Sequence, residues 1–211
     1  MAEEKDDDQD GKGNKSEIII GLLLAIFAAV LAINDLGAGR YGDDEKIAHN
    51  KHTEMYNWYQ SKSIKQSLLK GQIELMKTLE QAEAIKPELK EALAGNVAKM
   101  QKKIDAYDRE MREIQQGSKA VGQEGWAQDV KGEMGKIVGA EEYKAIYEKL
   151  NDAGDVYDLA TLFLQLCLVC GAISLILQGA AARKAFVTVM VVLGLIGAWY
   201  CWQAYTICFS L

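Results

Sequence analysis

Two histidines three residues apart, His49 and His52, are the side chains of this sequence best suited to bind a metal ion. Glu45 precedes His49 by four residues, so on a helix all three side chains lie on one face. Imidazole and carboxylate groups are common zinc ligands, but a closed zinc site needs four of them. The sequence offers two histidines in total, and all four cysteines lie after residue 166. We therefore expect these to be surface side chains, and we expect no bound metal or other cofactor.

A second spaced pair, Cys167 and Cys170, lies well inside an apolar stretch. Redox-active thiol pairs usually lie at an accessible helix N-terminus, so we expect these two cysteines to pack between helices. The sequence contains no Gly-x-Ser-x-Gly elbow, no Gly-x-x-x-x-Gly-Lys-Ser/Thr loop and no His-Glu-x-x-His motif. These observations predict a protein that is not an enzyme and that has no catalytic residues.

Three stretches without a charged residue or histidine determine the expected architecture: Ile18–Ile33, Leu159–Leu177 and Ala185–Leu211. A bilayer core is crossed by about 17 to 25 apolar helical residues, so each stretch is long enough or nearly so. We predict an all-α membrane protein with three transmembrane helices and a long antiparallel, coiled-coil-like helical hairpin outside the membrane. The expected segments are a disordered acidic tail (1–17), a first transmembrane helix (18–36), the extramembrane hairpin (37–158), a second transmembrane helix (159–178), a short basic loop (179–184) and a third transmembrane helix (185–209).

The extramembrane segment carries apolar residues at heptad spacing after Pro87. They begin with Leu93, Val97, Met100 and Ile104 and continue with Tyr107, Met111 and Ile114. Proline is favoured as the first residue of a helix, so Pro87 predicts a turn between two helices, although a single kinked helix stays open. The apolar stripe before Pro87 is broader than one partner helix covers. The seam is therefore either the inside of one hairpin or a surface for self-association.

Small residues in the predicted spans indicate close helix packing within the membrane. They are Gly21, Ala25, Ala28 and Ala32 in the first span and Gly194, Gly197 and Ala198 in the third. Because apolar burial gives no driving force in lipid, helices associate there through close contacts at such residues. The partner is either another helix of the same chain or a second copy.

Acidic residues lie where the predicted spans join the extramembrane segment, with Asp35, Asp155 and Asp158 as the candidate rim. Repeated around an oligomer, such a rim attracts cations to a pore. The alternative is that these are solvated acids near helix ends. The predicted spans contain no ionisable side chain of the kind that ion-coupled transporters use, so a passive pore is the form of transport that stays open.

Charge distribution argues against nucleic-acid binding and orients the chain. Residues 34–158 hold 19 basic and 23 acidic residues, a net charge of −4, whereas phosphate binding needs concentrated positive charge. The first span lacks a signal-peptide cleavage pattern, so we expect an uncleaved anchor. Lys12, Lys15, Arg183 and Lys184 would share one side of the membrane, which predicts a cytoplasmic N-terminus and a periplasmic hairpin.

The run of residues 34–45, Asn-Asp-Leu-Gly-Ala-Gly-Arg-Tyr-Gly-Asp-Asp-Glu, and the run of residues 55–68 resemble a family of uncharacterised bacterial membrane proteins grouped as a domain of unknown function. The resemblance covers the chain from the first span to the last. It implies a bacterial origin, an anchor, a long helical domain and two C-terminal spans, and it supplies no catalytic residues. From the residues themselves we expect Asn34 and Asp35 to cap a helix after the first span, and Tyr56, Trp58 and Tyr59 to dock that helix on the returning one.

The function that these observations favour is a non-enzymatic, homo-oligomeric inner-membrane scaffold or assembly protein with a projecting helical domain. The expected partners are membrane lipid, further copies of the chain and a possible membrane-protein partner. One alternative is an oligomeric ion channel or pore with an acidic mouth, and a second is an accessory subunit of a larger membrane complex.

Overall fold

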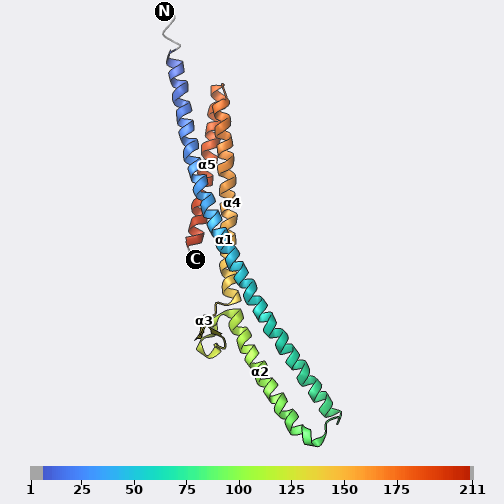
Figure 1. Ribbon diagram of the computed structural model, residues 1–211. Coiled ribbons are helices and arrows are strands. Elements are labelled where there is room, and N and C mark those ends of the chain that lie inside the picture. Colours follow the sequence, from blue (N-terminus) through green and yellow to red (C-terminus); the bar gives the residue numbers. More distant parts are fainter. Residues whose placement is uncertain (1–6, 210–211) are drawn as a thin grey trace, which may run out of the picture. The chain divides into compact units, whose positions relative to one another are not determined.

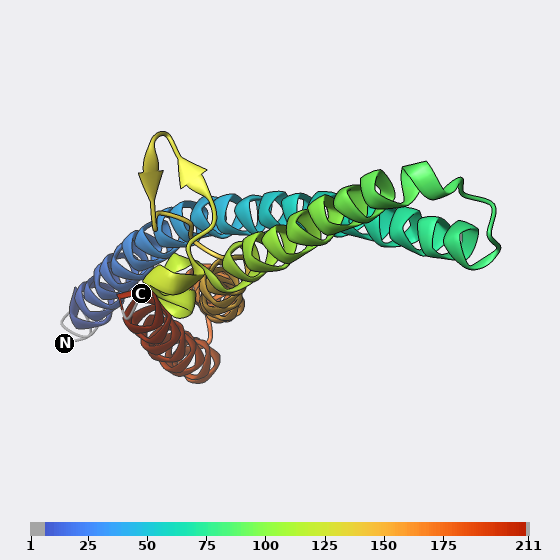
Figure 2. The ribbon, with the colours of Figure 1, turned by 90° about the horizontal axis from the view of Figure 1, so that it is seen from below.

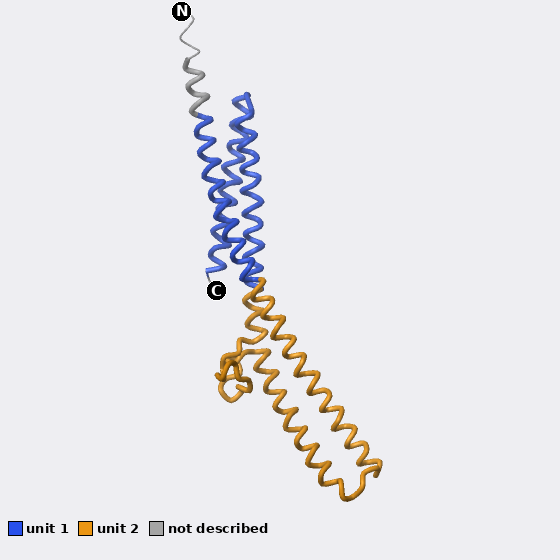
Figure 3. Tube along the Cα trace, in the orientation of Figure 1, with its two compact units in different colours: residues 1–45, 148–211 blue, residues 46–147 orange. Residues whose placement is uncertain are grey.

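The computed structural model describes the backbone of residues 7–209 and the side chains of residues 16–209, and it is all-α apart from one two-stranded hairpin (Figure 1). In chain order the elements are α1 (Asp7–Gln81), the short 3₁₀ helix η1 (Pro87–Leu89), α2 (Lys90–Gln116), α3 (Ser118–Val121), the 3₁₀ helix η2 (Gln123–Gly125), β1 (Asp129–Val130), β2 (Glu133–Met134), α4 (Ala140–Ile176) and α5 (Ala180–Phe209). They form two compact units. Unit 1 comprises residues 1–45 and 148–211, and unit 2 comprises residues 46–147 (Figure 3).

Helix α1 is continuous over 75 residues, so the first predicted span and the first hairpin helix are one element. The prediction that Asn34 and Asp35 cap a new helix is wrong, because both lie inside α1. The Asn34 side chain is fully buried instead, and its Nδ2 donates hydrogen bonds to Tyr157 O at 3.2 Å and to Thr161 Oγ1 at 2.8 Å on α4. Residues 1–6 of the predicted disordered tail lie outside the described residues, and α1 already begins at Asp7.

Unit 1 is built from parts of α1, α4 and α5 that pack around a shared apolar core. Phe27, Leu164, Cys167 and Met190 form its centre, with less than a tenth of each side chain exposed. Within the described residues, helices α1, α4 and α5 are each long and apolar enough to cross a membrane. The predicted fold class, an all-α protein with three such helices, is therefore confirmed.

The connection between α4 and α5 is shorter than the predicted loop of residues 179–184. It consists of residues 177–179, and α5 begins at Ala180. Gly179 O accepts a 2.9 Å hydrogen bond from Arg183 N, which closes the first turn of α5, and Lys184 is the next residue of this helix. Basic residues predicted in a loop are thus held on a helix.

Unit 2 is an antiparallel helical hairpin made by the C-terminal part of α1 and by α2 (Figure 2). Gln66 Nε2 donates to Asp108 Oδ1 at 2.6 Å, and Lys62 Nζ lies 2.6 Å from Glu110 Oε2, so residues earlier in α1 meet residues later in α2. The turn follows Gln81, and Pro87 opens η1 at its first position. Pro87 therefore marks a turn, because a proline ring has its φ preset for a helix start and cannot continue the preceding helix.

A compact joint, defined here as residues 117–139, links α2 to α4. It contains α3, η2 and the hairpin in which Asp129 pairs with Met134 and Val130 with Glu133. Gly117 has a φ of 90°, and a side chain there would meet Gly139 N, so only glycine suits this close approach of two backbones. The joint is therefore a folded segment although it contains six glycines.

Candidate functional site

The candidate metal ligands His49 and His52 face an aromatic ring. The His49 and Tyr147 ring centroids are 5.2 Å apart in an edge-on arrangement, and those of His52 and Tyr147 are 5.6 Å apart. Glu45 is partly exposed on the preceding turn of α1. Among the described residues, no group of three or more histidine, cysteine, aspartate or glutamate side chains is arranged to hold a metal ion.

A cleft of about 280 Å³ lies beside His52 in unit 2. Its lining comprises His52, Tyr56, Tyr59, Gln115, Ala140, Glu141 and Lys144. Glu141 Oε1 already accepts a 3.0 Å hydrogen bond from Gln115 Nε2, and the acid and the ammonium group offset each other in charge. Trp58 and Tyr59 are half-buried, whereas Tyr56 is 53% exposed. Of the three aromatic residues predicted to dock α1, Trp58 and Tyr59 are therefore better placed for that role than Tyr56.

The heptad seam of α2 is covered within the same chain. Leu93, Val97, Met100 and Tyr107 are half-buried, and Ile104, Met111 and Ile114 are buried. The α1 side repeats the same spacing with residues that are likewise half-buried or buried: Met55, Tyr59, Lys62, Gln66, Leu69, Ile73 and Met76. We call these two rows together the hairpin seam. Of the two uses that the sequence left open, the inside of one hairpin is the one the structure shows.

Two polar residues of α1 occupy positions in the hairpin seam that the apolar pattern does not reveal. Gln66 is only 6% exposed and donates from Nε2 to Asp108 Oδ1. Lys62 pairs with Glu110 and its Nζ also lies 5.5 Å from the ring centroid of Tyr107. A polar side chain between two helices stabilises one register of the pair, because sliding one helix along the other would leave that side chain without its hydrogen-bond partner.

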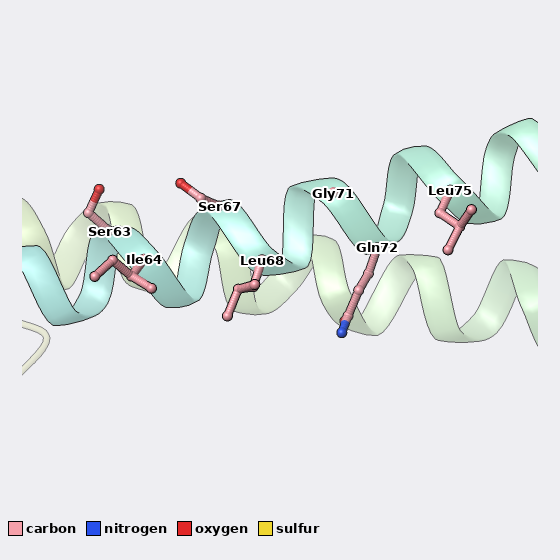
Figure 4. A pocket seen from close by; sticks show the side chains of 7 residues that line it. All are labelled: Ser63, Ile64, Ser67, Leu68, Gly71, Gln72 and Leu75. Carbon is pink, nitrogen blue, oxygen red and sulfur yellow. The ribbon is translucent and has the colours of Figure 1, made fainter.

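A second apolar row lies on the opposite side of α1. We name it the outer stripe and define it as Ile64, Leu68, Gly71 and Leu75. Each is displaced by two residues from a hairpin-seam position, which is a rotation of about 200° around a helix. Ile64, Leu68 and Leu75 are 60%, 63% and 60% exposed, and space around Gly71 is open to 4 Å. With Ser63, Ser67 and Gln72 they line a shallow groove of about 510 Å³ (Figure 4).

The small residues of the first and third spans have different surroundings. Gly194 and Gly197 are buried in unit 1, where a side chain at Gly194 would meet the Phe27 ring and one at Gly197 would meet Leu164. Ala198 beside them is half-buried. The first-span row, Gly21, Ala25, Ala28 and Ala32, is exposed on the described chain. Thus the glycines of the third span pack inside unit 1, whereas the small residues of the first span lie on its surface.

The candidate acidic rim is exposed throughout. Asp155 and Asp158 lie at the surface of unit 1, as does Asp35. Asp35 Oδ1 accepts a long 3.4 Å hydrogen bond from Thr161 Oγ1, next to the buried Asn34. Both interpretations, a pore mouth and solvated acids near helix ends, require exposed side chains. Exposure therefore does not distinguish them, and the acidic rim stays a prediction.

Glu113, which the sequence pattern does not single out, is fully buried in unit 2. Its Oε1 accepts a 2.7 Å hydrogen bond from Ser118 Oγ, and its Oε2 accepts bonds from Ala127 N at 2.7 Å and Gln128 N at 2.8 Å. Ser118 Oγ in turn accepts from Ile137 N at 2.9 Å. The carboxylate therefore holds the start and the middle of the joint on α2, which is a structural role. A lone glutamate at the end of a charged helix carries no sequence signal for it.

The model of a family described as Domain of unknown function (DUF4337) matches residues 16–207. No curated protein and no solved structure matches the chain.

Proposed function

As a member of the DUF4337 family, this chain inherits no assigned activity, and we propose that it is a non-enzymatic membrane scaffold that assembles with further copies of itself. The observation that supports this function is the outer stripe of α1. The hairpin seam already buries the opposite face of α1 against α2, so the stripe is not needed to hold the hairpin together. Contiguous exposed apolar side chains on a domain in water typically mark an interaction surface.

A second copy is the occupant that the composition of the stripe favours. The residues that line the groove are aliphatic, glycine or uncharged polar, so two copies meet there without bringing like charges together. Gly71 leaves an open gap between Leu68 and Leu75, which lets a partner helix approach closely. These are the features of a helix face that packs against an equivalent face.

Membrane attachment compensates for the small size of this surface. Stable complexes of soluble proteins usually bury about 1,200–2,000 Å², and one stripe of three large side chains supplies less than that. Copies held in one membrane are confined to a thin layer, which raises their effective concentration and lets a weak contact suffice. The exposed first-span row of Gly21, Ala25, Ala28 and Ala32 is suited to a second contact within lipid.

The test is the mass of the full-length protein extracted gently from its membrane. We expect the wild type to contain more than one copy, and the double variant Leu68→Glu/Leu75→Glu to contain fewer copies than the wild type, because each glutamate would bury a charge in the contact. Far-UV circular dichroism should stay unchanged, since both side chains are exposed. The matched control is Ile47→Glu/Leu89→Glu, which alters two apolar residues of similar exposure outside the stripe and should keep the wild-type mass.

A single-copy wild type, or an unchanged mass for the stripe variant, would refute self-assembly through this face. The same measurement tests the other two functions. A foreign protein present in constant ratio would support an accessory subunit. Conductance of the reconstituted oligomer that is lost on Asp35→Asn would support a channel.

A further inference from the structure

A groove of about 360 Å³ lies in unit 1 between the early part of α1 and the first turns of α5. Its polar lining includes Ser16, Arg183 and Lys184, and its apolar lining includes Ile19, Ile20 and Val187. The polar residues lie at one end of the apolar stretches of both helices, and the apolar residues lie about one turn further into those stretches. We name it the basic groove.

Arg183 is held in the groove with donor capacity to spare. Its Nε donates to Leu177 O at 3.1 Å, which fixes the guanidinium at the end of α4. Its Nη1 reaches Ser16 Oγ and its Nη2 reaches Glu17 Oε1, each at 3.4 Å. Charge-assisted hydrogen bonds of arginine are usually about 2.7–2.9 Å long, so both contacts are weak. A guanidinium carries five N–H donors in a fork that matches a phosphate group.

The charges around the groove favour an anion. Lys184 is exposed next to Arg183, and the two are the fourth and fifth residues of α5. The positive end of a helix dipole adds to their field. Glu17 is the acidic side chain in contact with Arg183, and it is half-exposed to solvent. The groove is thus lined by two cationic side chains near a helix N-terminus, whereas the carboxylate of Glu17 is not part of its lining.

The apolar wall identifies the kind of anion. Ile19 is 59% exposed and Ile20 is buried, and Val187 lies across from them on α5. A small soluble anion makes no use of such a wall, whereas an acyl chain running into the bilayer does. Basic pockets between membrane helices near the interface are typical sites for acidic lipid headgroups.

We propose that the basic groove is a specific site for an anionic phospholipid. Its phosphate contacts Arg183 and Lys184, and one acyl chain lies along Ile19 and Val187. All residues of the site belong to one chain, so a monomer already contains the complete site. The proposal therefore does not depend on the proposed self-assembly.

The experiment uses the full-length protein in nanodiscs of phosphatidylcholine with a minor share of phosphatidylglycerol, followed by native mass spectrometry of the released protein. We expect the wild type to retain phosphatidylglycerol in preference to phosphatidylcholine. Arg183→Gln/Lys184→Gln should bind it roughly thirtyfold more weakly, since each basic residue near a membrane surface contributes about a factor of five. Glycerol 3-phosphate, which lacks acyl chains, should not compete at equal concentration.

Lys184→Gln alone leaves the contacts of Arg183 with Leu177 and Glu17 in place, so it remains informative if the double variant does not fold. It should weaken binding roughly fivefold. The charge-matched control Lys86→Gln/Lys90→Gln removes two cations from unit 2 and should bind like the wild type. Equal retention of phosphatidylglycerol by the wild type and both groove variants would overturn the proposal. Full competition by glycerol 3-phosphate would show a phosphate site and overturn the lipid assignment.

Discussion

A buried carboxylate is tolerated only when hydrogen bonds replace the water it loses, and Glu113 meets that condition with three donors. Two are backbone amides of the joint, at Ala127 and Gln128, and the third is the Ser118 hydroxyl. This single side chain therefore supplies partners for segments that have little regular secondary structure. Asn34 has a comparable role in unit 1, where its amide joins α1 to α4.

We predict that Glu113→Ala lowers the stability of the joint by about 2–4 kcal/mol, because buried donors are left without an acceptor. Hydrogen exchange followed by mass spectrometry should show faster exchange across residues 117–139. Glu113→Gln retains one acceptor oxygen and should have a smaller effect. Glu124→Ala is the control, since Glu124 is exposed. If hydrogen exchange in Glu124→Ala were as fast as in Glu113→Ala, the role of Glu113 would be contradicted.

At the level of single elements, α1 in unit 2 has two apolar faces with different surroundings. One face packs on α2 along the hairpin seam, where Ile73 is 7% exposed. The other is the outer stripe, where Ile64 is 60% exposed. The two isoleucines are chemically identical, so the same substitution measures what each environment contributes.

Ile73→Ala should cost about 2–4 kcal/mol, because it removes buried methyl groups and leaves a cavity between α1 and α2. Ile64→Ala should change the stability of the single chain by less than about 0.5 kcal/mol. Thermal unfolding in a detergent that keeps the protein as a single copy measures both. An equal loss of stability in the two variants would contradict the assignment of one buried and one exposed face to α1.

In α5, Gly194 determines how closely that helix approaches α1. A side chain at this position would clash with the Phe27 ring, whereas one at Gly21 meets nothing within 4 Å. We predict that Gly194→Ala lowers the melting temperature of the detergent-solubilised protein by overpacking the core of unit 1. The additional substitution Phe27→Leu should restore part of the loss, and Gly21→Ala should have little effect. No rescue by the smaller side chain would argue against a direct contact.

For the whole molecule, the chain combines a three-helix unit with the composition of membrane spans and a hairpin unit with a charged exterior. The positive-inside rule applied to the short connection that precedes Arg183 and Lys184 still predicts that this connection faces the cytoplasm. The hairpin unit would then be periplasmic.

A cysteine-labelling experiment tests this orientation in a variant whose four native cysteines are replaced by alanine. We expect a membrane-impermeant maleimide to label Lys99→Cys once the outer membrane is opened. It should label Ala181→Cys only after the inner membrane is disrupted. Both positions are exposed in the structure. The reverse pattern would place the hairpin unit in the cytoplasm.

Much of this fold could be predicted because it depends on local chemistry. Uninterrupted apolar composition predicted the three spans, since a helix in lipid must satisfy its own backbone and present apolar side chains. Pro87 and the heptad spacing from Leu93 predicted the hairpin, since a proline ends one helix and suits the start of the next. The boundaries were less accurate: α1 continues through Asn34 without a cap, and α5 begins before Arg183.

What the sequence alone determined, therefore, is which segments are helical and which are apolar enough for lipid. Only the tertiary structure decided which faces are covered: the hairpin seam is buried within one chain, while the outer stripe and the first-span row are exposed. It also decided the roles of Glu113 and Asn34, whose partners lie in other segments of the chain. The physical reason is that helix formation and lipid solubility depend on neighbours in sequence, whereas burial and hydrogen-bond pairing depend on neighbours in space.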